Sequence, residues 1–236
     1  MKTLLTIGIL LVGLGLWAQS NTASIPGATT NASAASAAGI AVMIVYDGSG
    51  SMADPVPGID SKPTPKFFIA NKAVNSIIRQ LLAYSQGKHV EVQAGLVDFV
   101  GGKIQRPIPL LALTPETAKR FVAWTRDFRQ PEGGTPLGAA ILAAQKQLAT
   151  SQCLHQHILV ITDGMSNAGP PPEKVLKKLR NGDHPVPVYF VAFDVAADLF
   201  KPVKEEGAMV VSASDETQLN TEINAILGQK ILLEAE

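Results

Sequence analysis

The chain has 236 residues, with 20 lysine plus arginine against 20 aspartate plus glutamate, so its formal net charge is zero. A neutral chain without a basic stripe produces no field that attracts nucleic acid, so we expect no nucleic-acid partner. The length suits one domain of ordinary size with a substantial buried core.

The first segment, residues 1–20, reads MKTLLTIGILLVGLGLWAQS. An early lysine, an apolar run and the small-x-small triplet Ala18-Gln19-Ser20 predict a secretory signal peptide. The alternative is an uncleaved membrane anchor, but the run is shorter than the roughly 20 residues that a spanning helix needs. We therefore expect an exported protein, and the C-terminal ILLEAE, which carries no anchoring signal, favours a periplasmic or secreted location.

Residues 21–39 are small and polar, without hydrophobic periodicity, which predicts a flexible low-complexity linker. A folded domain is expected over residues 40–230, followed by a short tail at 231–236. Cys153 is the only cysteine, so it cannot form an internal disulfide. We expect it to be a small apolar residue near the start of a strand rather than a nucleophile.

Within the domain, short apolar runs alternate with segments of helical periodicity. Buried strands are predicted at 39–47, 89–100, 157–163, 186–194 and 208–214. Helices are predicted at 65–85, 114–128, 136–150, 170–180, 196–207 and 215–229. The run 103–110 predicts a short return strand, and Pro107 and Pro109 restrict it to an edge.

This alternation predicts an α/β domain with a doubly wound, Rossmann-like sheet. The sheet should be mostly parallel, with one short antiparallel edge strand and helices on both faces. Ligands of such sheets bind beyond the carboxyl ends of the strands, where the strand order reverses. Asp47 and Asp163 each end a predicted strand, so both should lie at that edge.

Oxygen-bearing side chains gather at the same edge. Asp47, Ser49 and Ser51 alternate along one loop, in which Gly48 and Gly50 allow a tight turn. Thr135 adds a hydroxyl and Asp163 a second carboxylate. Oxygen ligands suit a hard cation, so these five residues predict a site for Mg²⁺, with Mn²⁺ or Ca²⁺ as alternatives.

Three short stretches resemble the von Willebrand factor type A domains that carry a metal-ion-dependent adhesion site. Asp47-Gly48-Ser49-Gly50-Ser51 is similar to the D-x-S-x-S loop of that family, Gly134-Thr135-Pro136-Leu137 to its threonine loop, and Thr162-Asp163-Gly164 to its second aspartate loop. The resemblance covers about residues 40–228. It implies one divalent ion held by Asp47, Ser49, Ser51, Thr135 and Asp163, directly or through water. It also implies that a glutamate or aspartate of a protein or peptide partner completes the shell, and that the last helix shifts when ligand binds.

Two other functions are possible for the same motif. A metal-dependent hydrolase acting on a phosphate or ester would need a base beside its nucleophile, and the motif places no histidine or lysine next to Ser49 or Ser51. We therefore expect no enzymatic activity. A purely structural loop is the third possibility, which the complete set of five ligands disfavours.

Five further positions have alternative interpretations. Asp54 could hold a second, adjacent ion, although Asp54-Pro55 is also an ordinary turn. His155 and His157 could bind a transition metal, but an exposed strand start is the simpler interpretation. Asp194 and Asp98 are each interpreted as a solvated strand end, with Asp194 as a candidate for the rim of the site.

Overall fold

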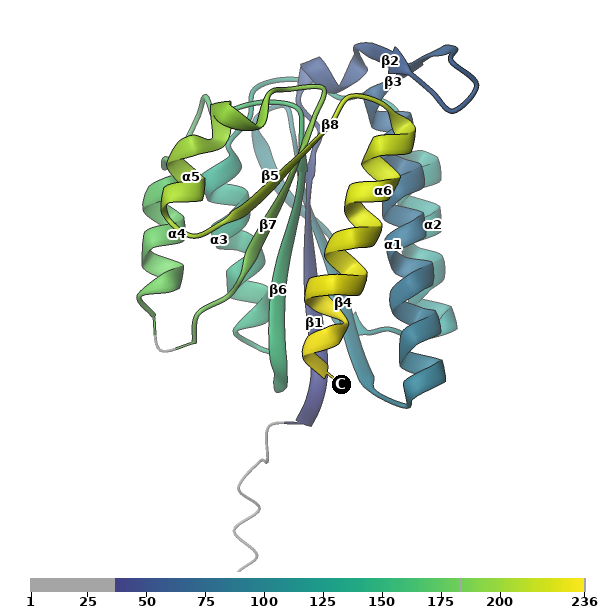
Figure 1. The fold of residues 1–236 in the computed structure, drawn as a ribbon, viewed down its shortest axis with the longest axis vertical. Coiled ribbons are helices and arrows are strands. Elements are labelled where there is room, and N and C mark those ends of the chain that lie inside the picture. The colour runs from purple at the N-terminus through teal and green to yellow at the C-terminus, as the bar shows by residue number, and fades with distance from the viewer. Residues whose placement is uncertain (1–36, 183, 236) are drawn as a thin grey trace, which may run out of the picture. The chain divides into compact units, whose positions relative to one another are not determined.

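The computed structural model describes residues 37–182 and 184–235 (Figure 1). The predicted signal peptide and residues 21–36 of the predicted linker lie outside the described residues. None of the helices in this described part is both long and apolar enough to cross a membrane.

The centre of the fold is a six-stranded sheet with the order β5-β4-β1-β6-β7-β8. Its strands are β1 (Ala37–Asp47), β4 (Glu91–Val100), β5 (Lys103–Ala112), β6 (Cys153–Thr162), β7 (Val188–Phe193) and β8 (Met209–Ala213). Neighbouring strands run parallel except for β4 and β5, which pair antiparallel. This arrangement confirms the predicted doubly wound, mostly parallel sheet with one antiparallel edge strand.

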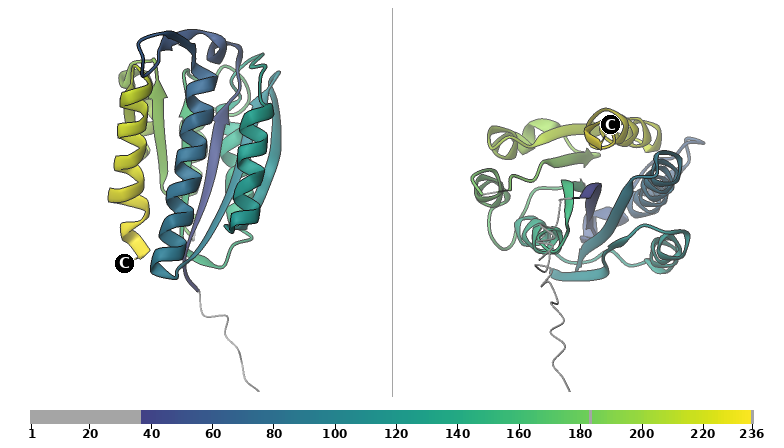
Figure 2. Two further views of the ribbon diagram at one scale, coloured as in Figure 1. Left: turned by 90° about the vertical axis from the view of Figure 1, so that its right-hand side faces the viewer. Right: turned by 90° about the horizontal axis from the view of Figure 1, so that it is seen from below.

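The helices cover the two faces of the sheet in separate groups (Figures 1 and 2). One face carries α1 (Lys66–Lys88), α2 (Pro115–Asp127) and α6 (Glu216–Ile226), and the other carries α3 (Leu137–Leu148), α4 (Pro172–Arg180) and α5 (Lys201–Glu205). Alternate side chains of β1 enter the two cores: Ile44 packs with the first group and Val45 with the second. The central strand is therefore buried on both faces, which explains its unbroken apolar sequence.

The edge strand β5 is longer than predicted, with ten residues, and it contains both prolines. A proline lacks an N–H group, so it can be accommodated where one side of a strand has no neighbour. Glycine residues with positive φ, Gly101 (61°) and Gly102 (71°), form the turn that leads from β4 into β5.

A small hairpin before α1 was not predicted. Its strands are β2 (Pro55–Pro57) and β3 (Pro63–Pro65), preceded by a 3₁₀ turn at Gly50–Ala53. Four prolines in eleven residues predict a loop rather than a strand, so the local sequence hides this pairing. A distant contact helps to hold it: the Ile59 N–H donates to Glu216 Oε2 at 3.2 Å, across 157 residues.

Both ends of the domain differ from the predicted boundaries. β1 begins at Ala37, inside the segment assigned to the linker. At the other end, α6 continues into a π-helical turn (Leu227–Ile231) and a 3₁₀ turn (Leu233–Ala235). Ile231, the first residue of the predicted tail, is fully buried in the core. The sequence of residues 231–236 is too short and too mixed in polarity to predict that Ile231 packs in the core.

Candidate metal centre

The topology brings the two predicted acids together. In the order β5-β4-β1-β6-β7-β8, the chain builds outward in opposite directions from β1 and β6. Asp47 is the last residue of β1, and Asp163 follows the last residue of β6. Both acids therefore lie at the carboxyl edge of adjacent strands, at the switch point where such sheets bind ligands.

The first loop is held close to β4. The Gly48 N–H donates to the Phe99 carbonyl at 3.1 Å. A Cβ at Gly48 would lie 2.6 Å from that same carbonyl oxygen, so only glycine fits. At Gly50 the nearest atom to such a Cβ is 3.8 Å away, an ordinary contact. The two glycines are thus not equivalent: Gly48 permits a close approach, whereas Gly50 has no such steric requirement.

The threonine loop is tied to the first loop and to the turn after β6. The Gly50 N–H donates to the Gly133 carbonyl at 3.1 Å, and Gly133 has a φ of 78°, a region that favours glycine. Asn167 holds the next turn, because its Oδ1 accepts from the Thr135 N–H at 2.7 Å and its own N–H donates to the Thr135 carbonyl at 3.1 Å. The side chain and the backbone N–H of Asn167 therefore position Thr135.

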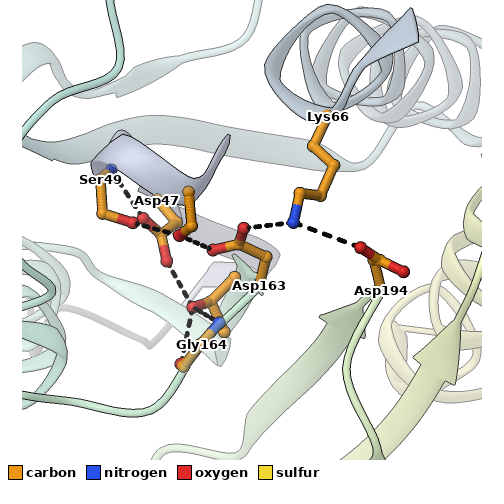
Figure 3. A network of polar contacts seen from close by, with 8 residues as sticks. Asp47, Ser49, Lys66, Asp163, Gly164 and Asp194 are labelled. Carbon is orange, nitrogen blue, oxygen red and sulfur yellow. Dashed lines mark hydrogen bonds and ion pairs between the residues drawn. The ribbon is translucent and has the colours of Figure 1, made fainter. Parts of the chain in front are cut away.

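Four of the five predicted residues form one hydrogen-bonded network (Figure 3). The Ser51 hydroxyl donates to Asp163 Oδ1 at 2.8 Å and lies 3.3 Å from the Ser49 hydroxyl. The Ser49 N–H donates to Asp47 Oδ1 at 2.8 Å. Thr135 is the fifth predicted residue, and its backbone bonds to Asn167 rather than to a member of this network.

This donor set fits a hard cation. The side chains of Asp47, Ser49, Thr135 and Asp163 are buried, and all of their donor atoms are carboxylate or hydroxyl oxygens. Among the described residues, no three or more His, Cys, Asp and Glu side chains are grouped so that they could hold a metal ion. The candidate centre therefore depends on its hydroxyls as much as on its two carboxylates, which is compatible with Mg²⁺.

Thr162 is a supporting residue that the predicted ligand set omits. Its hydroxyl donates to Asp47 Oδ2 at 2.5 Å, across 115 residues. Both oxygens of Asp47 are thus fixed by protein donors. Burial raises the pKa of Asp47 to about 6, although the hydrogen bonds from Ser49 and Thr162 oppose this increase.

Lys66, the first residue of α1, reaches the same centre and was not predicted. Its ammonium lies 2.8 Å from Asp163 Oδ2 and 3.3 Å from Asp194 Oδ2 (Figure 3). Burial opposes a charge on Lys66, but the hydrogen bonds and charges of Asp163 and Asp194 outweigh it and raise the pKa of Lys66. The sequence contained one signal: a lysine at the N-terminus of a helix opposes the helix dipole.

Asp194 lies on the rim of the centre, which was the alternative to a solvated strand end. Its carboxylate is half exposed and pairs with Lys66, and its backbone has a φ of 56°. Asp54 is exposed, and its backbone forms bonds on both sides, donating to the Ser51 carbonyl and accepting from the Lys66 N–H. Within the described part of the chain, no hydrogen bond or ion pair joins the Asp54 side chain to the network, so a second ion there stays a prediction.

The expectation of a solvated strand end is wrong for Asp98. The side chain is buried beneath α2, where Trp124 is a hydrogen-bond donor to it, and its Oδ1 has no partner among the described residues. Burial raises the pKa of Asp98 to about 6. The covering helix is distant in sequence, which is why the local pattern did not indicate burial.

The expectation of an exposed strand start is wrong for His157. β6 begins at Cys153, so His157 lies within the strand, fully buried beside the ring of Tyr189. His155 Nδ1 and His157 Nε2 lie 3.6 Å and 3.5 Å from Glu234 Oε2 in the C-terminal turn. Burial lowers the pKa of His157 to about 4, and His155 adds to this decrease.

The sheet order and the three loops define the class of protein. The profile of the von Willebrand factor type A domain matches residues 41–225, so the chain belongs to this family. The family comprises protein-interaction and adhesion modules. Among curated proteins, none matches the chain in sequence.

Solved structures share the fold at low sequence identity. A D319A mutant of the PilB minor pilin from Streptococcus sanguinis superposes with a TM-score of 0.66 at 16% identity, over 84% of this chain and 62% of the pilin. A von Willebrand factor type A protein from Catenulispora acidiphila superposes with a TM-score of 0.62 at 16% identity, over 80% of this chain and 42% of that protein. BatB from Bacteroides thetaiotaomicron superposes with a TM-score of 0.61 at 15% identity, over 83% of this chain and 100% of BatB. The chain thus spans less than two thirds of the length of the first two proteins.

Proposed function

We propose that this chain is an exported binding module that holds a divalent cation and binds a protein partner through an acidic side chain. Mg²⁺ is the first choice of ion, with Mn²⁺ or Ca²⁺ as alternatives, and its ligands are Asp47, Ser49, Ser51, Thr135 and Asp163. The contact between Ser51 and Asp163 carries the proposal, because it joins the loops after β1 and β6 through two oxygen atoms of the ligand set at 2.8 Å.

The proposed chemistry follows from the charges at the centre. When bound, the ion supplies a positive charge that attracts a partner's glutamate or aspartate. Asp47 and Asp163 balance the formal charge of a divalent ion, whereas the serine and threonine hydroxyls bind without adding charge. Thr162 and the Ser49 N–H orient Asp47, so that its carboxylate needs little rearrangement when the ion binds.

The geometry does not favour the hydrolase alternative. Activation of Ser49 or Ser51 as a nucleophile requires an adjacent base. The nearby nitrogen of Lys66 contacts the carboxylates of Asp163 and Asp194, and its raised pKa keeps it protonated. A protonated amine cannot accept a proton, so Lys66 cannot serve as that base.

Export is proposed from the predicted signal peptide, and proteins of similar structure support it. The similar structures include the PilB minor pilin and an aerotolerance-related membrane protein from Bacteroides fragilis, at 16% identity each. We infer a location outside the cytoplasm, where the cation-bearing edge of the sheet would meet a partner protein. Extracellular or periplasmic fractionation of the native host would test this inference.

The metal claim is tested by thermal unfolding in Mg²⁺ and Mn²⁺. A ligand that binds only the folded state stabilises it by about 2.7 kcal/mol at one hundred times its Kd. We expect the melting temperature to rise with either ion, and the rise to disappear in Thr135→Val and Asp163→Ala. Thr221→Val is the matched control, because its hydroxyl donates to the Thr217 carbonyl of the preceding helical turn, within α6. A parent protein whose melting temperature ignores both ions would contradict the proposal.

The partner claim is tested by capture from the native host in the presence of Mg²⁺ and of EDTA. A partner bound through the ion should be retained with Mg²⁺ and released by EDTA. Proteins that bind equally in both conditions, and equally to Thr135→Val, would contradict a metal-bridged contact.

A further inference from the structure

Lys66 occupies an unusual position for a lysine. It is the first residue of the 23-residue helix α1, it follows Pro65, and its side chain is 6% exposed. The positive end of the helix dipole and the loss of hydration both disfavour an ammonium group there. No feature of the helix itself compensates, because the first turn of α1 contains no acidic residue.

The compensation comes from the metal centre. Lys66 Nζ lies 2.8 Å from Asp163 Oδ2, while the other oxygen of Asp163 accepts from Ser51. Asp163 therefore serves two groups at once: a hydroxyl of the ligand set and a buried cation. Asp194, whose side chain is 45% exposed, shares the ammonium at 3.3 Å from the rim.

We propose that Lys66 is a built-in counter-cation that lowers the affinity of the centre for a divalent ion. This inference rests on the proposed function. The buried groups Asp47, Asp163 and Lys66 sum to a charge of minus one, and the half-exposed carboxylate of Asp194 on the rim only partly offsets the ammonium, so a divalent ion leaves a surplus positive charge among the buried groups. Repulsion between the two cations opposes metal binding, and the surplus charge favours the acidic ligand that the proposed function requires.

Two substitutions distinguish the effect of the charge of Lys66 from the effect of its packing. Lys66→Met keeps the aliphatic stem but removes the charge, so we expect the Kd for Mg²⁺ to fall about tenfold, which corresponds to about 1.4 kcal/mol. Lys66→Arg keeps the charge and should bind Mg²⁺ as weakly as the parent. Lys62→Met is the control, because it removes the same charge from an exposed pair with Asp60.

Asp194→Asn provides a test that does not require the loss of a buried charge. Since the Asp194 side chain is half exposed, this variant should fold normally. It leaves the ammonium of Lys66 to Asp163 alone, so we expect Mg²⁺ to bind several-fold more weakly than to the parent. The change is opposite in sign to that of Lys66→Met, and a general loosening of the loop would not produce such a pair of results.

Isothermal titration of MgCl₂ into the full chain measures all of these affinities, and circular dichroism checks the fold. Equal Kd values for the parent and Lys66→Met would overturn the role of Lys66 and leave the proposed function intact. Binding of Mg²⁺ by Lys66→Met but not by the parent would support the role of Lys66 and would contradict the proposed function of the parent chain. No binding by any variant would refute the proposed function and, with it, this inference.

Discussion

The hydroxyl of Ser51 lies 2.8 Å from Oδ1 of Asp163, although 112 residues separate the two in sequence. The contact joins the loop after β1 to the loop after β6, on either side of the switch point of the sheet. It also links a proposed ligand hydroxyl to the carboxylate that Lys66 binds from the other side. This single contact therefore joins the two loops at the switch point and places a proposed ligand beside the carboxylate that pairs with Lys66.

Ser51→Ala should affect both stability and metal binding. Loss of one partly buried hydrogen bond costs about 0.5–1.5 kcal/mol of the free energy of unfolding. The variant should also lose most of the rise in melting temperature produced by Mg²⁺. Ser85→Ala is a matched control, because it removes a bond of 2.8 Å to the Val90 carbonyl far from the centre. A normal Mg²⁺ response in Ser51→Ala would remove Ser51 from the ligand set.

Gly48→Ala and Gly50→Ala should differ sharply although they are two residues apart. A methyl group at Gly48 would lie 2.6 Å from the Phe99 carbonyl oxygen, and the loop would have to move. We expect a loss of about 1–3 kcal/mol in the free energy of unfolding. At Gly50 a methyl group would make only ordinary contacts, the nearest at 3.8 Å, so the change should be below about 0.5 kcal/mol. Urea unfolding of both variants would check this order, and equal losses would contradict it.

Asp98→Asn should stabilise the protein above pH 6. Because burial raises the pKa of Asp98 to about 6, the folded state holds the proton more tightly than the unfolded state. Stability therefore falls as the pH rises from about 4 to 6, and the full cost is present above pH 6. We expect the free energy of unfolding of Asp98→Asn to exceed that of the parent by on the order of 1 kcal/mol at pH 8, and the difference to disappear near pH 4. Urea unfolding at the two pH values measures the difference, and a gain that is independent of pH would contradict the assignment.

His157 should have the opposite pH dependence. Its pKa is lowered to about 4, so the folded state keeps it neutral, while the unfolded state takes up a proton below about 6.5. Its contribution to stability is therefore present above pH 6.5 and is lost as the pH falls toward 4. His157→Phe should remove this loss, which amounts to about 3 kcal/mol between pH 7 and pH 4. His184→Gln, at an exposed site, is the control, and parallel pH profiles for the parent and His157→Phe would refute the prediction.

The order of elements could be read from local patterns. Unbroken apolar runs marked the strands that are buried on both faces, and spacings of three and four marked the helices. Thr114 illustrates why such signals suffice: it caps α2 through a reciprocal pair of bonds with Thr117, three residues away. Where the stabilising partner is this close, sequence and structure carry the same information.

The sequence by itself therefore determined the fold class, the family and the five candidate ligands, because strand ends and loop motifs are local features. The tertiary structure decided what surrounds those ligands. Thr162 meets Asp47 across 115 residues, and Lys66 meets Asp194 across 128. Burial of Asp98 and His157 likewise depends on elements that are distant in sequence. Such contacts form only when the sheet is assembled, because a local sequence pattern does not show which distant charged residues will be buried next to one another.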